Sequence, residues 1–212
     1  MKQETAAPEE NATVAPVTAI VLAAGMSRRM GAQNKLLLPV DGQQPMVRVV
    51  VSQALQACEQ VVVVLGHEAG RVREALADLP VVFVHNPGYA EGMGGSVSVG
   101  ARMAAPGHAV LVCLGDMPGV TAQVMRALAQ AGASGAAACR PVHEGRPGNP
   151  VWWAPDQVDA LQSLSGDEGA RALLANLREQ GRLCEVPVET PGVLWDVDTP
   201  QAWLRRRTTC AG

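Results

Sequence analysis

Short aliphatic runs alternate with longer amphipathic stretches along most of the chain. The runs are uninterrupted, which is typical of strands buried on both faces of a parallel sheet. They predict strands at residues 19–22, 61–65, 81–84 and 109–114. Helical spacing of apolar residues predicts helices at 46–58, 71–79 and 121–128, the last capped by Thr121 and stopped at Gly132.

The same alternation continues more weakly in the second half of the chain. It predicts strands at 136–139, 151–153 and 183–188, helices at 156–164 and 167–180, and a final helix opened by Thr199 and Pro200. Strands that alternate with helices pair in parallel through right-handed crossovers. The sequence therefore predicts an α/β fold, a three-layer sandwich with a mostly parallel sheet.

Composition indicates one globular domain with short polar ends. The 212 residues suffice for one sizeable core. Residues 1–16 are rich in Ala, Glu, Pro and Thr, so we expect a disordered leader there, a domain at 17–207 and a disordered tail at 208–212. The formal net charge is only −3, and two of these negative charges fall in the leader. A nearly neutral domain gives no reason to expect nucleic-acid binding, which usually needs a basic face.

Cysteine use and hydropathy favour a cytoplasmic protein. The five cysteines are scattered, with no Cys-x-x-Cys spacing, and are expected to be reduced. No apolar run has the length needed to span a membrane. We therefore expect neither a membrane partner nor a zinc site.

A glycine-punctuated turn follows the first predicted strand. Gly25 and Gly31 let backbone N–H groups approach an anion. Arg28, Arg29 and Lys35 are the nearest cations for a polyphosphate. The spacing of the glycines differs from that of a P-loop, and a serine replaces the second glycine of the dinucleotide fingerprint. We therefore expect a phosphate-binding loop of another kind.

Two carboxylates are candidates for a metal site. Asp116 directly follows the predicted strand at 109–114, and Asp198 lies just before the final helix. Ligands of open α/β sheets sit beyond the carboxyl ends of the strands, where the glycine turn is also expected. Mg²⁺ prefers such oxygen ligands together with phosphates and water. Asp196 is the alternative to Asp198, and either Asp116 or Asp198 could instead cap a turn or helix.

Several motifs together resemble one family. The segment 22–35 resembles the Leu-Ala-Ala-Gly-x-Ser-x-Arg-Met-Gly signature, with its nearby Lys, of nucleotidyltransferases related to molybdenum cofactor cytidylyltransferase and guanylyltransferase. Residues 86–96 are similar to the family's base-and-ribose loop, 115–118 to its metal-binding Gly-Asp-x-Pro, 166–171 to a further segment and 196–200 to its Asp-x-Asp-Thr-Pro. The resemblance covers about residues 17–207 and implies a Rossmann-like nucleotidyltransferase fold. Asn149, where relatives often carry His, departs from the pattern and concerns the acceptor side.

The resemblance implies a role for each candidate residue. Lys35 and Arg28 are the implied catalytic cations, and Asp116 and Asp198 the implied Mg²⁺ ligands. The implied nucleotide-binding residues are Leu22, Ala23, Ala24, Gly25, Ser27, Arg29, Gly31, Gly95 and Ser96.

The implied reaction transfers CMP from CTP to the terminal phosphate of a molybdopterin-type cofactor and releases pyrophosphate. Guanylyltransferases of the family carry a glycine at the position of Ala24, and the added methyl group is expected to narrow the space for a purine, which favours CTP. Trp152 and Trp153 point to opposite faces of a strand, so one is expected in the core and the other could stack on the pterin. A recipient molybdoenzyme is a possible partner.

Two alternatives remain open at this point. The same chemistry could act on a sugar phosphate or another small phosphate ester. A non-catalytic chaperone that carries the cofactor to a molybdoenzyme would instead show a degraded lysine or metal site, and neither is degraded in this sequence. An oxidoreductase is disfavoured because the Gly-x-Gly-x-x-Gly fingerprint is missing.

Overall fold

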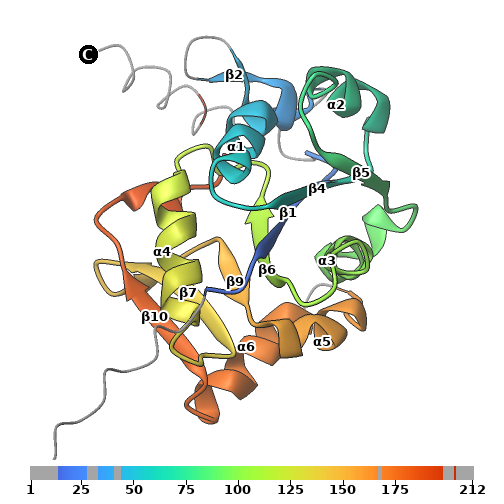
Figure 1. Ribbon diagram of the computed structural model, residues 1–212. Coiled ribbons are helices and arrows are strands. Elements are labelled where there is room, and N and C mark those ends of the chain that lie inside the picture. Colours follow the sequence, from blue (N-terminus) through green and yellow to red (C-terminus); the bar gives the residue numbers. More distant parts are fainter. Residues whose placement is uncertain (1–13, 28–32, 41–43, 167–168, 198–202, 204–212) are drawn as a thin grey trace, which may run out of the picture.

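A twisted central sheet with helices on both faces forms the body of the protein (Figure 1). The computed structural model describes residues 14–27, 33–40, 44–166, 169–197 and 203. Within these residues the sheet has the strand order β10-β7-β9-β6-β1-β4-β5, and β8 pairs with β7. Its strands are β1 (Val17–Ala23), β4 (Gln60–Leu65), β5 (Val82–His85), β6 (Ala109–Leu114), β7 (Ala138–His143), β8 (Arg146–Pro147), β9 (Val151–Trp153) and β10 (Leu183–Pro187). A separate small hairpin joins β2 (Pro39–Val40) to β3 (Gln44–Pro45).

The helices form the two outer layers. One face of the sheet is covered by α1 (Met46–Leu55), α2 (Ala69–Ala75) and α4 (Ala122–Gly132). The other is covered by α3 (Met93–Ala101), α5 (Val158–Gln162) and α6 (Gly169–Glu179). Short 3₁₀ turns are η2 (Lys35–Leu37), η3 (Tyr89–Glu91), η4 (Pro155–Gln157) and η5 (Pro191–Leu194). The predicted three-layer α/β sandwich is confirmed, and no helix among the described residues has both the length and the hydropathy to span a membrane.

Strand β1 is the centre of the core because both of its faces are covered. Its odd-numbered residues pack under α1 and α4, whereas Ile20 packs toward α3. Ala19, Ile20 and Val21 have no exposed surface. Parallel neighbours β4 and β6 pair along its length, so all three strands end at the same edge of the sheet. This edge is where the glycine turn and Asp116 begin.

The sheet is mostly parallel, as predicted, with antiparallel exceptions in its second half. Strand β9 runs antiparallel to both β6 and β7, and β8 forms a hairpin with β7. The pair of β7 and β10 is again parallel. The antiparallel strand therefore separates the sheet into a first half, built from residues 17–114, and a second half.

One local prediction needs a different reason, and another was wrong. Helix α4 does end at Gly132, as predicted, but Gly132 does not act through its backbone freedom: it is the last helical residue, and an added Cβ would lie 2.4 Å from the Trp152 ring. Its role is to let that ring pack closely, and Gly135, with φ +91°, makes the turn instead. Trp152 and Trp153 do point to opposite faces but are only 3% and 2% exposed, so neither can stack on a ligand.

Other predicted boundaries moved by a few residues or cannot be compared. The helix predicted at 71–79 is α2, which begins at Ala69 and ends at Ala75. Thr121 caps α4 as predicted by accepting a hydrogen bond from the Val124 N–H. Residues 1–13, most of the predicted final helix and the tail at 208–212 lie outside the described residues, so the predicted ends of the domain stay predictions.

Candidate active site

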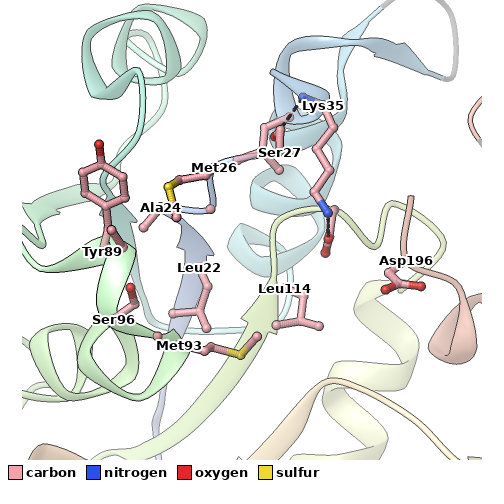
Figure 2. A pocket seen from close by; sticks show the side chains of 15 residues that line it. Leu22, Ala24, Met26, Ser27, Lys35, Tyr89, Met93, Ser96, Leu114 and Asp196 are labelled. Atoms are coloured by element: carbon pink, nitrogen blue, oxygen red, sulfur yellow. Dashed lines mark hydrogen bonds and ion pairs between the residues drawn. The ribbon is translucent and has the colours of Figure 1, made fainter. Parts of the chain in front are cut away.

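A cleft of about 480 Å³ lies at the carboxyl ends of β1 and β6 (Figure 2). Its walls come from the turn after β1, from η2, from the segment around η3 and α3, from the end of β6 and from the segment after η5. The residues that line it are Leu22, Ala24, Gly25, Met26, Ser27, Lys35, Leu36, Tyr89, Ala90, Gly92, Met93, Ser96, Leu114, Asp116 and Asp196. The topology therefore brings distant parts of the sequence to one crevice.

Lys35 and Asp116 form an ion pair across this cleft. The Lys35 Nζ atom lies 2.5 Å from Asp116 Oδ2, and the two side chains are only 13% and 16% exposed. Gly115 brings Asp116 close to β1, because its N–H donates to the Leu22 carbonyl at 3.0 Å and an added Cβ would lie 2.8 Å from that oxygen. A larger residue there would push the carboxylate away from β1.

Ser27, in the turn after β1, contacts the backbone of Lys35. Its backbone is left-handed, with φ +50°, and its hydroxyl accepts a hydrogen bond from the Lys35 N–H at 3.2 Å. Asn34 caps η2 by accepting from the Leu36 N–H at 3.1 Å through its side-chain oxygen. These two contacts fix the backbone on both sides of Lys35.

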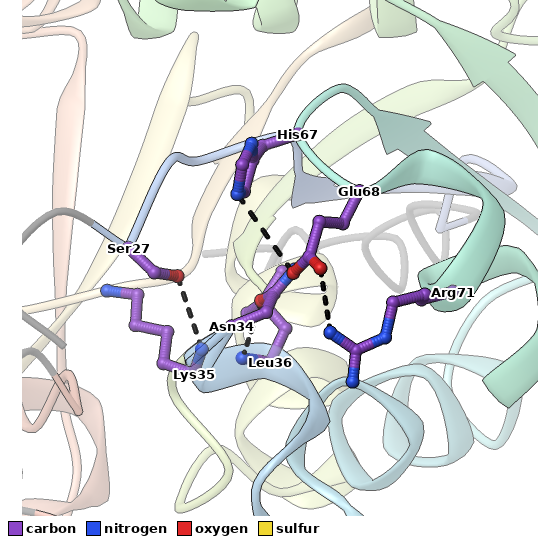
Figure 3. A network of polar contacts seen from close by, with 7 residues as sticks. All are labelled: Ser27, Asn34, Lys35, Leu36, His67, Glu68 and Arg71. Atoms are coloured by element: carbon purple, nitrogen blue, oxygen red, sulfur yellow. Dashed lines mark hydrogen bonds and ion pairs between the residues drawn. The ribbon is translucent and has the colours of Figure 1, made fainter. Parts of the chain in front are cut away.

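A polar network supports η2 from the side of α2 (Figure 3). Glu68 precedes α2 with φ +50° and forms an ion pair with Arg71, with Arg71 Nη1 at 2.7 Å from Glu68 Oε1. The amide nitrogen of Asn34 is buried, has no well-formed hydrogen bond among the described residues, and faces the Glu68 carboxylate. The Arg71 guanidinium first, and the Asn34 amide to a smaller extent, hold the pKa of Glu68 below its usual range.

The opposite wall of the cleft is built by α3 and the loop before it. Asn86 donates from its amide nitrogen to the Ser96 hydroxyl at 3.0 Å, and its amide oxygen accepts from the Gly88 N–H at 3.0 Å. Gly92, with φ +130°, turns the chain into α3. Figure 2 places Ser96 and Tyr89 on the side of the cleft away from the Lys35 ammonium.

A second carboxylate, Asp196, reaches the cleft from the C-terminal part of the chain. The Val197 N–H donates to the Asp116 carbonyl at 3.1 Å, and this bond holds the neighbouring Asp196 in the cleft wall. Gly192 packs flush against Gly119, where an added Cβ would lie 2.2 Å from the carbonyl oxygen. This close packing keeps the segment after η5 beside the end of β6.

Comparison with known proteins identifies the fold family. The family described as the MobA-like NTP transferase domain matches residues 19–182. The chain belongs to this family. It is 30% identical over 190 residues to a molybdenum cofactor cytidylyltransferase of Escherichia coli K12, covering 89% of this chain and 94% of that protein.

Further similar proteins show how varied the relatives are. A protein of Paenarthrobacter nicotinovorans named nicotine blue oxidoreductase is 30% identical over 198 residues, covering 89% of this chain and 95% of that protein. The crystal structure of Rv0371c from Mycobacterium tuberculosis H37Rv in complex with manganese superposes with a TM-score of 0.74 and 27% identity, covering 92% and 100% of the two chains. The chain is therefore a nucleotidyltransferase-family protein with a Rossmann-like nucleotidyltransferase fold, and its substrates need separate argument.

The MobA-like cleft brings together most of the candidate residues that the structure describes. Leu22, Ala24, Gly25, Ser27, Lys35, Ser96 and Asp116 all line it. Ala23 and Gly95 do not: the Ala23 methyl group is buried in the core, and Gly95 lies next to the Asn86 amide. Arg28, Arg29, Gly31 and Asp198 lie outside the described residues, so their roles stay predictions.

Sequence reasoning missed part of the cleft wall. Met26, Tyr89 and Met93 line it but were not among the candidate residues. Tyr89 is the only tyrosine of the chain and lies in a glycine-rich loop, which was an available signal. The two methionines lie at positions to which sequence reasoning gave no role of their own.

The donor set suits a hard divalent cation. Two carboxylates, Asp116 and Asp196, line the cleft. The first of them, Asp116, already binds one cation, the Lys35 ammonium group. Among the described residues, no three acidic, histidine or cysteine side chains gather into a metal site. Phosphate oxygens and water would therefore have to complete the ligands of Mg²⁺, which is how this ion is usually held beside nucleotides.

Proposed function

We propose that the protein transfers CMP from CTP to the terminal phosphate of a molybdopterin-type cofactor and releases pyrophosphate. The observation that carries the proposal is the Lys35 and Asp116 pair at the carboxyl ends of β1 and β6. The pair sets an ammonium group, which could bind phosphate, beside a carboxylate, which could bind a metal, and this supports nucleotidyl transfer in the cleft of a MobA-like NTP transferase. The similarity to the cytidylyltransferase of E. coli over most of both chains supports the choice of substrates.

The reaction needs positioning more than acid or base chemistry. The terminal phosphate of the acceptor attacks the α-phosphorus of CTP, a new P–O bond forms, and the bond to pyrophosphate breaks. A phosphate monoester has a second pKa of about 6 and is largely dianionic at neutral pH, so no side chain has to remove a proton. The protein accelerates such a step by orientation and by stabilising negative charge.

Lys35 exchanges partners during this cycle. Its ammonium pairs with Asp116 in the structure, and a bound triphosphate offers phosphate oxygens as competing partners. Arg28 and Arg29 are proposed to grip the same phosphates. Asp116, with Asp198 or Asp196, is proposed to hold Mg²⁺, which supplies charge neutralisation on the triphosphate when bound. The manganese complex of the similar Rv0371c structure supports the use of a divalent ion.

Ala24 is proposed to favour the smaller pyrimidine base. It lines the cleft, is 5% exposed and sits beside Gly66, where an added Cβ would lie 2.8 Å from the Ala24 methyl group. The cleft wall is therefore tightly packed at Ala24. A purine base would have less room beside this methyl group than it would have beside a glycine at the same position. One methyl group in a pocket changes discrimination by ~1–3 kcal/mol, so the preference for CTP need not be absolute.

The test is pyrophosphate release by the purified protein with Mg²⁺, each of the four ribonucleoside triphosphates in turn, and freshly prepared molybdenum cofactor. We expect release with CTP and its loss in Asp116→Ala. Equal release with GTP would contradict the assignment of the base. Release only with a sugar phosphate would favour the alternative acceptor, and CTP binding without turnover would favour a cofactor-carrying chaperone.

Two further parts of the proposal concern the cell. We propose a cytoplasmic location, supported by the free thiols of Cys58, Cys113, Cys139 and Cys184. We also propose that the product is handed to a recipient molybdoenzyme. Co-purification of the protein with a molybdoenzyme in cells that express both tests the second point.

A further inference from the structure

The two buried side chains Asn86 and Ser96 fix the direction of a hydroxyl group in the cleft wall. Both residues are only 4% exposed. The Gly88 N–H, which can only donate, lies 3.0 Å from the Asn86 amide oxygen. This contact settles which end of the amide is which, so the NH₂ end faces Ser96 Oγ at 3.0 Å.

The Ser96 hydroxyl must therefore accept from Asn86. An amide NH₂ group has no lone pair to offer, whereas a hydroxyl has one hydrogen and two acceptor sites. Within the described part of the chain, no other hydrogen bond of the Ser96 hydroxyl competes for its hydrogen. Because Ser96 lines the cleft, this hydrogen remains available to a ligand there.

We propose that Asn86 is a positioning residue that holds the Ser96 hydroxyl as a hydrogen-bond donor to an acceptor atom of the cytosine ring. The inference rests on the proposed use of CTP. Figure 2 shows Ser96 on the side of the cleft away from the Lys35 ammonium, which is where the nucleoside lies if Lys35 binds the phosphates. Cytosine offers two ring-side acceptors, N3 and O2, and its amino group would meet a donor unfavourably.

Asn86→Asp tests the direction of the hydroxyl. A carboxylate has nearly the same shape and still accepts from the Gly88 N–H, but it cannot donate to Ser96. The Ser96 hydroxyl then donates to the carboxylate and presents only lone pairs to the cleft. We expect the Kd for CTP, measured by calorimetry without any acceptor substrate, to rise about 10- to 100-fold.

Ser96→Ala and the double variant separate this effect from added negative charge. Ser96→Ala should weaken CTP binding about tenfold, and adding Asn86→Asp to it should cause little further loss. A full additional loss in the double variant would mean that the carboxylate acts through charge or folding, and would overturn the proposal. Uncharged cytidine, which a carboxylate does not repel, should follow the same order of affinities as CTP.

Ser98→Ala is the matched control. Ser98 lies on the same helix and is similarly buried at 5% exposed, but its hydroxyl donates to the Gln162 carbonyl, outside the cleft wall. This variant should bind CTP as the wild type does, and its melting temperature shows what loss of a buried α3 hydroxyl costs in stability. Ser96→Ala with CTP affinity within twofold of Ser98→Ala would contradict the inference.

Deoxynucleotides distinguish the base from the ribose. If Ser96 binds the base, Ser96→Ala should weaken the binding of both 2′-deoxy-CTP and 3′-deoxy-CTP as much as it weakens the binding of CTP. If the loss disappears with one of them, the partner is that ribose hydroxyl and the assignment to the cytosine ring is wrong. Wild-type protein that binds no nucleotide would instead overturn the proposed function, whereas CTP binding without turnover would leave this inference standing.

Discussion

The ion pair of Lys35 and Asp116 joins the two groups that are proposed to contact a phosphate and a metal. The lysine is held by η2 and Ser27, and the aspartate by the close approach of Gly115 to β1, so neither depends on the other for its place. The proposed exchange of the pair for a phosphate and a metal would therefore need little movement of the backbone. This arrangement favours a cleft that is organised before the nucleotide arrives.

Removal of the lysine tests its place in the reaction. Lys35→Ala should lower turnover by about 10²–10³, because a charge-stabilising group is lost where negative charge develops. Turnover with CTP and the molybdenum cofactor measures this, with Arg126→Ala as the control, since its exposed guanidinium only donates to the Gln56 carbonyl. Folded Lys35→Ala protein with wild-type turnover would show that the assignment is wrong.

Ala24 provides a second residue-scale prediction. Ala24→Gly should raise the use of GTP relative to CTP by about tenfold or more, because loss of one methyl group is worth ~1–3 kcal/mol of discrimination. The ratio of kcat/KM for the two nucleotides measures the change. An unchanged ratio would mean that the base is selected elsewhere on the wall.

At the scale of the elements, η2 depends on its cap and on the network beside α2. Asn34→Asp keeps an oxygen for the Leu36 N–H but places a second carboxylate against Glu68. The pKa of Glu68 lies below its usual range because of Arg71, so Glu68 is ionised at neutral pH and the two carboxylates repel. We expect a melting temperature a few degrees below that of the wild type at neutral pH.

Acidification should reduce that difference. Mutual repulsion raises the pKa values of the two carboxylates, so they take up protons as the pH falls toward about 4, and the destabilising term is lost. Thermal melts across this range measure it. Asn34→Ala is the contrasting variant: it removes the cap, which is worth about 1 kcal/mol, and should be destabilised at every pH.

The sequence predicted most elements and about half of the cleft. The strands β1, β4 and β6 were predictable because their aliphatic runs are unbroken, and Asp116 because it follows such a run. The antiparallel direction of β9 could not be predicted, because a strand of three residues carries no information about which neighbours it pairs with or in which direction. The sequence offered Asp196 only as an alternative to Asp198, because its place depends on a backbone contact between Val197 and Asp116 that no periodicity encodes.

At the scale of the whole molecule, the cleft depends on contacts between the loop after β6 and the C-terminal segment around η5. The 3₁₀ turn η5 packs against the loop after β6, and its residue Gly192 allows this close approach. Gly192→Ala should lower the free energy of unfolding by about 1–3 kcal/mol, since an added Cβ would overlap the Gly119 carbonyl. Turnover should fall as well, because Asp196 moves with the segment.

Gly70→Ala is the control for this prediction. Gly70 lies in α2, and an added Cβ there meets nothing within 4 Å. Alanine in a helix is favoured over glycine by about 0.5–1 kcal/mol, so this variant should be as stable as the wild type or slightly more. Urea unfolding of both variants measures the contrast, and equal effects would argue against the packing explanation.

The position of β9 has a consequence for how the chain is made. Strand β6 pairs with β1 on one side and, among the described residues, with β9 on the other. On a ribosome β9 emerges after β6 by the time needed to add the intervening residues 115–150, which is roughly 2–7 s at typical rates of elongation. During that time the nascent chain presents the apolar edge Ala109–Leu114 without a partner, the kind of edge on which chains aggregate. Newly made protein should therefore be most dependent on chaperones shortly before its antiparallel strand emerges.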